Sequence, residues 1–331
     1  MNRLLPIKSG PWIWALLSLV LILLFNLVFT HGFFSVEVRD GNLYGSVIDI
    51  LNRAAPVMLV ALGMTLIIAT GGVDLSVGAI MAIIGSIAAL LVTKQHASLP
   101  IILVICLASA TVLGLWNGTL VSIFKVQPIV ATLILMVSGR GIAQLLTDGQ
   151  IIQFKDPSLS FVGNGFLFKI PFSITLVLLM LVATTLITRK TAMGLFIESV
   201  GDNPTASRYS GIDIRTVQLF VYAFCGFCSG IAGLVATANT SAADANNVGM
   251  NLELDAILAV VIGGTKLTGG RFQLIGSLFG ALVIQSLTTT ILTKGLAIEY
   301  TLVVKALTVL AVCLLQSPQF RSRFGFGRRT A

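Results

Sequence analysis

The chain has 331 residues, of which 56% are hydrophobic and only 10% are charged. Soluble domains carry about 25% charged residues, so this composition excludes an ordinary soluble protein. The net charge of +8 does not indicate a nucleic-acid partner, because Lys and Arg gather at the chain ends and in short stretches between apolar runs.

Apolar stretches near the roughly 20 residues that cross a bilayer as a helix recur along the whole chain. No alternating strand pattern competes with them. We therefore predict an all-α polytopic membrane protein with a single transmembrane domain over 1–331 and a membrane-embedded core over 12–316. About ten crossings fit the hydropathy: 12–29, 47–70, 75–93, 99–121, 128–147, 171–188, 216–237, 254–270, 271–293 and 298–316.

The predicted crossing at 254–270 is the weakest of the set. Its run "LDAILAVVIGG" provides about eleven apolar residues, roughly 16 Å of helix and half a bilayer. We expect a half-helix or a re-entrant element there.

The distribution of Lys and Arg over alternate loops predicts the topology. The excess falls on one side of the membrane when the N-terminus is placed in the cytoplasm. We therefore expect both termini in the cytoplasm, a cytoplasmic loop over 190–215 and a basic cytoplasmic tail over 317–331.

One aspartate stands inside an apolar region, in "GGVDLSVG". An ionised carboxylate at the bilayer centre costs about 2.5 to 3.5 kcal/mol, so Asp74 needs water, protein donors or a proton. After Gly71 and Gly72 its carboxylate is placed to cap a helix that begins at Leu75. The alternative is a helix break, with Ser76, that lines a translocation path. The sequence leaves both interpretations open.

Three more polar residues, Asn117, Arg140 and Gln144, lie inside apolar segments. Arg140 and Gln144 share one helix face because they are an i, i+4 pair, and this face should turn away from lipid. A polar stripe that lines a pore and one that joins two helices both explain the pair. The same two interpretations apply to Asn117.

The 190–215 loop contains the signals of a short helix. Asn203 can cap its start, Pro204 suits the first helical position, and Gly211 supplies a left-handed stop. The sequence therefore predicts a surface helix from Pro204 to Ser210. An ordinary capped loop helix and a docking element have the same signals.

The outer loop "NTSAADANNVGMNLELD" is rich in Asn and acidic residues. A solvated connector explains this composition, and so does a mouth that meets a partner or a polyhydroxylated solute. The residues that would form such a mouth are Asp244, Asn246, Asn247, Glu253 and Asp255.

A faint internal repeat relates "GGVDLSVG" to "GGTKLTGG" at 263–270. Lys266 takes the place of Asp74, and Thr268 takes the place of Ser76. Repeated halves with broken helices at matching positions are frequent in transporters. From the predicted crossings we expect the two copies to point the same way, and chance similarity in a Gly-rich chain remains an alternative.

Several motifs of enzymes are missing from the sequence. It contains no G-x-x-x-x-G-K-[ST] phosphate loop, no H-E-x-x-H and no G-x-S-x-G. No Cys and His pairs have the spacing of a metal site. We therefore expect neither an enzyme nor a metal or cofactor site in this chain.

Four stretches together resemble the permease subunits of ribose-type bacterial ABC importers for monosaccharides. They are "GMTLIIATGGVDLSVGA", "VQPIVATLILMVSGRGIAQLL", "GLFIESVGDNPTASRYSGI" and "LELDAILAVVIGGTKLTGG". The resemblance runs from about Asp49 to Gln316. "GSVIDILNRAAPV" and "ADANNVGMNLELDAILAVVIGG" look closest to the galactofuranose-type permeases.

This resemblance implies a type II ABC importer permease fold, placed as a multi-pass protein in a bacterial inner membrane. It implies a pathway for a monosaccharide, galactofuranose, with ATP and Mg²⁺ held by a partner ATPase rather than by this chain. The other partners implied are a second permease, identical or not, and a periplasmic sugar-binding protein.

The resemblance also implies roles for the motif residues. The residues expected to couple to the ATPase are Gly201, Asp202, Asn203, Pro204, Ala206, Arg208, Tyr209 and Gly211. Those expected along the translocation path or its gate are Gly71, Gly72, Asp74, Ser76, Asn117, Arg140, Gln144, Lys266 and Thr268. Asp202 stands where the family often has a second Gly, which leaves the local turn open. The rival hypothesis is a secondary transporter in which Asp74 carries a coupling ion.

Overall fold

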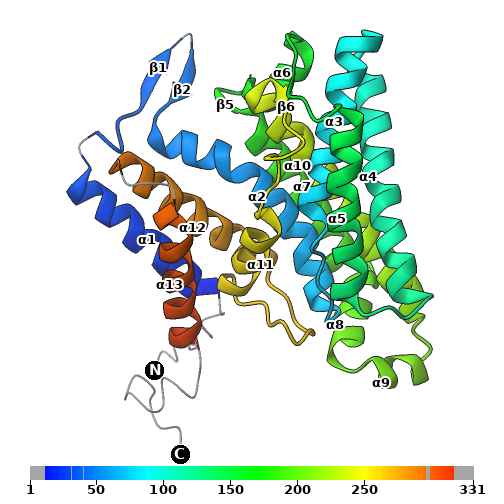
Figure 1. Cartoon of the computed structure of the whole chain (residues 1–331). Helices are drawn as coiled ribbons and strands as arrows, with labels where there is room; N and C mark the ends of the chain where they lie inside the picture. Colours follow the sequence, from blue (N-terminus) through cyan, green and yellow to red (C-terminus); the bar gives the residue numbers. More distant parts are fainter. Residues whose placement is uncertain (1–11, 31, 40, 296–298, 317–331) are drawn as a thin grey trace, which may run out of the picture.

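The computed structural model describes residues 12–30, 32–39, 41–295 and 299–316 (Figure 1). The predicted basic tail at 317–331 lies outside these residues. Helices dominate the described part, and they are α1 (Trp12–Phe29), α2 (Ser46–Ala69), α3 (Val77–Gln95), α4 (Leu99–Ser122), α5 (Pro128–Leu146), α6 (Pro157–Asn164), α7 (Phe172–Lys190), α8 (Met193–Asp202), α9 (Pro204–Tyr209), α10 (Ile214–Thr240), α11 (Leu252–Ile262), α12 (Leu274–Thr293) and α13 (Glu299–Gln316).

Short antiparallel strand pairs join some of the helices. The strands are β1 (Glu37–Arg39), β2 (Asn42–Tyr44), β3 (Ile152–Gln153), β4 (Phe166–Leu167), β5 (Ile170–Pro171) and β6 (Ala242–Ala243). β1 pairs with β2 and β4 with β5, whereas β3 pairs with the distant β6. The β3–β6 pair fixes the loop after α5 to the loop after α10.

Eight described helices are long and apolar enough to cross a membrane: α1, α2, α3, α4, α5, α7, α10 and α12. The segment at 254–270, the weakest predicted crossing, is not one continuous helix, because α11 ends at Ile262 and the glycine-rich 263–270 is irregular. The expected half-helix is confirmed. The predicted crossing at 298–316 coincides with α13, a helix of 18 residues.

The interior of the fold is built from α2, α3 and α10. In an apolar 18-residue stretch of each helix, 83% of the residues of α2 and 78% of those of α3 are buried. The corresponding shares are 17% in α1 and 22% in α4. A helix that other helices surround needs no polar face, which agrees with the apolar composition of α2 and α3. The outer helices expose Leu, Val and Ile side chains instead.

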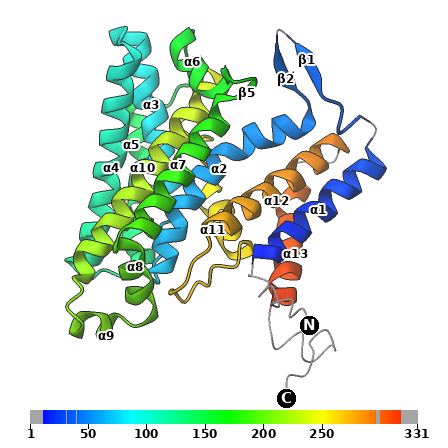
Figure 2. The same ribbon diagram turned by 180° about the vertical axis from the view of Figure 1, so that it is seen from behind.

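The helices form two groups with α2 between them (Figures 1 and 2). One group holds α3, α4, α5, α7 and α10, and the other holds α1, α12 and α13. The helix α2 bends along its course, and Pro56 lies in its interior. α11 packs against α12 and α2 and so lies where the groups meet.

The two ends of the molecule differ. One end carries α8, α9 and the irregular segment 263–273, and we call it the α9 face. The opposite end carries the β1–β2 hairpin, α6 and the β3–β6 pair, and we call it the α6 face (Figure 2). Each face gathers segments that are far apart in the sequence.

Candidate functional site

The short helix predicted in the 190–215 loop is present as α9 and ends one residue earlier than expected, at Tyr209. The side-chain oxygen of Asn203 accepts a hydrogen bond from the N–H of Ala206 at 3.0 Å. Pro204 occupies the first turn, and Gly211 has φ +84° after the helix end. The local signals place this helix because each acts on backbone groups within one turn.

Most of α9 is open to solvent. Tyr209 is 89% exposed and Arg208 is exposed, whereas Ser207 alone among the residues of α9 is buried. A large aromatic side chain presented in this way at the end of the molecule has no internal packing role. The side chains of α9 therefore make little packing contact with the rest of the described chain.

A basic pocket lies next to α9. Its volume is about 380 Å³, and Lys125, Arg208, Asp213 and Arg215 are among the residues that line it. The hydroxyl of Thr216 donates to Asp213 at 2.6 Å, and this bond, with the backbone N–H bonds to the carboxylate, holds the pKa of Asp213 below its usual value. The carboxylate thus stays ionised beside three cations, and the pocket keeps a net positive charge.

The α8–α9 unit is tied to the rest of the fold through Gly201. A Cβ at Gly201 would lie 1.8 Å from the carbonyl oxygen of Ala69 and 2.5 Å from the N–H nitrogen of Gly270. The N–H of Gly270 also donates to the Ala69 carbonyl at 2.9 Å. Because no side chain fits at this junction, three backbone segments touch directly beneath α9.

The two copies of the internal repeat meet at the same junction. A Cβ at Gly269 would lie 3.1 Å from the nitrogen of Gly71 and 2.8 Å from the Gly201 oxygen. The matched positions Asp74 and Lys266 are placed differently. Lys266 lines a cavity of about 710 Å³ on the α9 face, together with Thr268, Asp202, Glu198 and Arg271.

Asp74 is buried, with none of its surface exposed. Its Oδ1 accepts from the N–H of Ser76 at 2.9 Å, from the Ser76 hydroxyl at 2.6 Å and from Nδ2 of Asn117 at 3.4 Å. The expectation that it caps a helix beginning at Leu75 is wrong, because α3 begins at Val77 after Ser76. Asp74 closes the turn before the helix instead, since its side chain bonds to Ser76.

The cluster around Asp74 retains unused acceptor capacity. Within the described residues, Oδ2 of Asp74 and Oδ1 of Asn117 are buried and have no hydrogen-bond partner. Asn117 also donates to the Ser76 hydroxyl at 2.8 Å and so joins α4 to the turn. This polar cluster connects helices, and no part of it is exposed.

Arg140 and Gln144 hold the outer loop to α5. Nη1 of Arg140 donates to the carbonyls of Ala245 at 2.9 Å and Val248 at 2.7 Å. Nε2 of Gln144 donates to Oδ1 of Asn246 at 2.6 Å. The polar pair on α5 and the residues of the outer loop, which the sequence suggested as separate sites, therefore form one hydrogen-bond network. Arg140 and Gln144 hold the loop in position.

Asp244 shapes the same loop from within. Its Oδ1 accepts from the N–H of Asn246 and of Asn247, and its Oδ2 accepts from Nδ2 of Asn247. The loop is thus preorganised rather than an open coil.

The two remaining acidic residues of the predicted mouth lie in the first turn of α11. Glu253 is only 4% exposed. Asp255 forms an ion pair of 2.8 Å with Lys305 of α13. The sequence analysis missed Lys305, although a lysine inside the apolar run "LVVKALTV" is the signal that such a residue has a nearby partner.

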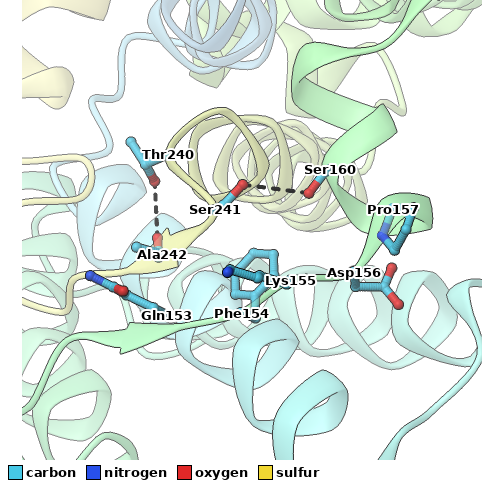
Figure 3. A pocket seen from close by; sticks show the side chains of 9 residues that line it. All are labelled: Gln153, Phe154, Lys155, Asp156, Pro157, Ser160, Thr240, Ser241 and Ala242. Carbon is cyan, nitrogen blue, oxygen red and sulfur yellow. Dashed lines mark hydrogen bonds between the residues drawn. The ribbon is translucent and has the colours of Figure 1, made fainter.

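A cavity of about 860 Å³ opens on the α6 face (Figure 3). It lies along the β3–β6 pair and the start of α6, and Lys155 and Asp156 are among its lining residues. The hydroxyls of Ser160 and Ser241 are 3.4 Å apart, and the Thr240 hydroxyl donates to the Ala242 carbonyl at 3.0 Å. Sequence reasoning could not find this cavity, because it depends on the long-range β3–β6 pairing.

In the described part of the chain, no group of three or more His, Cys, Asp or Glu side chains comes together. Cys106, Cys225 and Cys228 are buried free thiols. The polar residues of this site can bind, position and cap, which are the tasks of a binding or transport protein.

Comparison with known proteins gives a family match over residues 46–313 to the model described as branched-chain amino acid transport system / permease component. The chain is 52% identical to the galactofuranose transporter permease protein YtfT of Escherichia coli over 93% of its length and 90% of that protein. It is 38% identical to the fructose import permease protein FruF of Bifidobacterium longum, over 97% and 92% of the two chains.

A third relative is the ribose import permease protein RbsC of Haemophilus influenzae, which is 36% identical over 90% of both chains. No solved structure matches the chain.

Proposed function

This chain belongs to the permease family described as branched-chain amino acid transport system / permease component, and from that premise we propose that it forms the membrane pathway of an ATP-driven importer for a monosaccharide, galactofuranose. The family description alone names amino acids. The proposal of a sugar substrate rests on the sequence identity with the galactofuranose permease along nearly the whole chain. The similarity to the fructose and ribose permeases supports it.

We propose that α9 is the element that docks on a partner ATPase, which holds the ATP and Mg²⁺. Exposed Tyr209 and Arg208 and the basic pocket beside them support this assignment. The proposed coupling residues lie at the end of α8, in α9 and just after α9. They are Gly201, Asp202, Asn203, Pro204, Ala206, Arg208, Tyr209 and Gly211. With this docking the α9 face is cytoplasmic, as the Lys and Arg bias predicts for both chain termini.

We assign the other proposed partners to the α6 face and to the sides of the molecule. A periplasmic sugar-binding protein would dock on the α6 face, where the loops and the cavity of Figure 3 lie. A second permease subunit, identical or not, would complete the pathway in the inner membrane. The chain itself is proposed to carry no cofactor.

The glycine junction supports a route for coupling. Motion of α9 passes through Gly201 to the end of α2 at Gly71 and to the second repeat copy at Thr268 and Gly269, because these backbones are in contact. The polar cluster of Asp74, Ser76 and Asn117 then keeps the α2–α3 turn rigid. Rigid elements that touch at a few backbone points suit alternating access driven from outside the chain.

Reconstitution in proteoliposomes tests this function. The chain is combined with the ATPase, a second permease and the binding protein, and uptake of labelled galactofuranose, galactopyranose and ribose is measured with and without ATP. We expect galactofuranose uptake that requires ATP, the ATPase and the binding protein. Uptake by the chain alone under a proton or sodium gradient would refute the importer and support the ion-coupled alternative that uses Asp74.

A further inference from the structure

The chain between β6 and α11 enters the membrane region without forming a helix. Ala245 packs in one cluster with Ala82 and Ile83 of α3. Further along, a Cβ at Gly78 would lie only 2.2 Å from the Gly249 carbonyl oxygen. The helix α3 ends at Gln95, towards the α6 face. With a rise of 1.5 Å per residue, Gly78 lies about 25 Å along the helix from that end.

The segment 244–251 is therefore irregular backbone at membrane depth. Gly249 has φ +70° and Asn251 has φ +61°, so the chain turns sharply before α11. Irregular backbone is tolerated at this depth only where protein covers it or water wets it, because lipid cannot satisfy its polar groups.

One side of this segment is satisfied by protein. Arg140 binds two of its carbonyls, and Asp244 binds the N–H groups of Asn246 and Asn247. The acidic side chains that follow the segment are buried or paired. Glu253 is buried, and Asp255 forms an ion pair with Lys305.

The other side is open and carries uncharged amides. Asn246, Asn247 and Asn251 are exposed, and between and beside them Met250 is 59% and Leu254 is 52% exposed. Figure 1 shows this segment on the near side of the molecule, between α5 and α11. We call these five residues the amide strip.

The amide strip differs from the lipid-facing surface. The exposed side chains of α4 include Val104, Val112 and Ile101, which suit hydrocarbon. A carboxamide both donates and accepts hydrogen bonds, and burying it without partners is unfavourable. The strip therefore does not face lipid, and it needs water or a hydrogen-bonding ligand.

We infer that the amide strip is the wall of the sugar conduit that touches the cargo, an inference that rests on the proposed function. Oδ1 of Asn246 and Nδ2 of Asn247 are bonded to Gln144 and Asp244. The carboxamide of Asn251, with Nδ2 of Asn246 and Oδ1 of Asn247, pairs with sugar hydroxyls, while Met250 and Leu254 meet the apolar C–H faces of the ring. The absence of a free charge suits a neutral sugar that must leave again. Asp74 and Asn117 have no exposed surface and so are not part of this wall.

Cysteine labelling tests the inference. The Asn251→Cys variant is treated in membranes with a charged, water-soluble thiosulfonate, and the wild-type chain, whose described cysteines are buried, sets the background. The matched controls are Val112→Cys on the lipid-facing side of α4 and Gln150→Cys, which is exposed near the α6 face. We expect labelling at Asn251→Cys and Gln150→Cys but not at Val112→Cys.

Transport gives the second measurement. Labelling of Asn251→Cys should block ATP-driven sugar uptake about tenfold or more, because the adduct fills the conduit. The double variant Asn247→Ala/Asn251→Ala should lower sugar uptake several-fold with its ATPase stimulation intact.

The outcomes separate this inference from the proposed function. If the unlabelled chain transports sugar but Asn251→Cys is inert to the charged reagent, or is reached only by an apolar maleimide, the strip is dry and the inference is wrong. If Asn251→Cys is labelled but its uptake continues, the strip is wet without being the conduit, which also refutes it. If the wild-type assembly takes up no sugar, the proposed function fails whatever the labelling shows.

Discussion

The backbone of Gly201 rests directly on the carbonyl of Ala69, so that a Cβ on Gly201 would overlap the Ala69 oxygen at 1.8 Å. Backbone on both sides leaves no flexible side chain to move aside. This contact fixes how closely the end of α8, and with it α9, approaches the end of α2.

Gly201→Ala is therefore expected to push the α8–α9 unit away from α2. Sugar uptake by the reconstituted importer should fall about tenfold or more, because α9 no longer moves α2 with it. The matched control is Gly141→Ala on α5, where a Cβ meets nothing within 4 Å. Equal uptake by both variants, at equal amounts in the membrane, would contradict the role of the junction.

The stop of α9 gives a second prediction. Gly211 has φ +84°, which Pro cannot adopt because its ring fixes φ near about −65°. Gly211→Pro should insert normally and still allow ATP hydrolysis, but uptake should be uncoupled from it. Gly211→Asn is the control, since Asn tolerates the left-handed region.

The exposed arginine of α9 tests the same docking surface by charge. Arg208→Glu places a carboxylate next to Asp213 at the basic pocket and should lower the ATPase affinity and the coupled uptake. Arg208→Lys should retain most of both. Normal coupled uptake by Arg208→Glu would speak against α9 as the docking element.

Local signals in the sequence predicted some of these features well. The start and end of α9 depend on Asn203, Pro204 and Gly211, which act on neighbouring backbone. The half-helix α11 follows from the length of one apolar run. The start of α3 was misplaced, because the bonds of Asp74 to Ser76 delay the first helical turn to Val77.

Features that depend on distant segments could not be predicted. Nothing in the sequence pairs Arg140 with the Ala245 and Val248 carbonyls, because carbonyl acceptors are present at every residue. The contact of Gly201 with Ala69 likewise depends on how two loops approach in space. Such contacts arise from packing and leave no periodic pattern.

The geometry around Asp74 allows a prediction about whether transport needs the charge of this carboxylate. Asp74→Asn keeps the Oδ1 acceptor for Ser76, and its new N–H₂ supplies a donor in a place where Oδ1 of Asn117 has no partner among the described residues. We expect thermal stability at or above that of the parent and at least part of the transport. Complete loss of transport by a well-folded Asp74→Asn protein would indicate a path that depends on the charge.

Asp74→Leu is the contrasting variant. It leaves the N–H and hydroxyl of Ser76 and the amide of Asn117 without their shared acceptor inside the fold. Each buried donor left without a partner costs about 1 to 3 kcal/mol. The melting temperature in detergent should therefore fall well below that of Asp74→Asn, and equal values would show that the cluster does not stabilise the turn.

The ion pair between Asp255 and Lys305 fixes the broken crossing, because it ties α11 to α13 at 2.8 Å. The side chains are 22% and 12% exposed, so water screens the pair only in part. Lys305→Met should destabilise the protein by about 1 to 3 kcal/mol after allowance for this exposure, since the carboxylate loses its partner. The charge-reversed double variant Asp255→Lys/Lys305→Asp restores an attractive pair and should recover much of the loss, whereas Lys305→Asp alone should be the least stable of the three. Thermal unfolding in detergent measures this order. A double variant no more stable than Lys305→Asp would mean that the two side chains act independently, and α11 would then be held in place by its packing on α12 and α2.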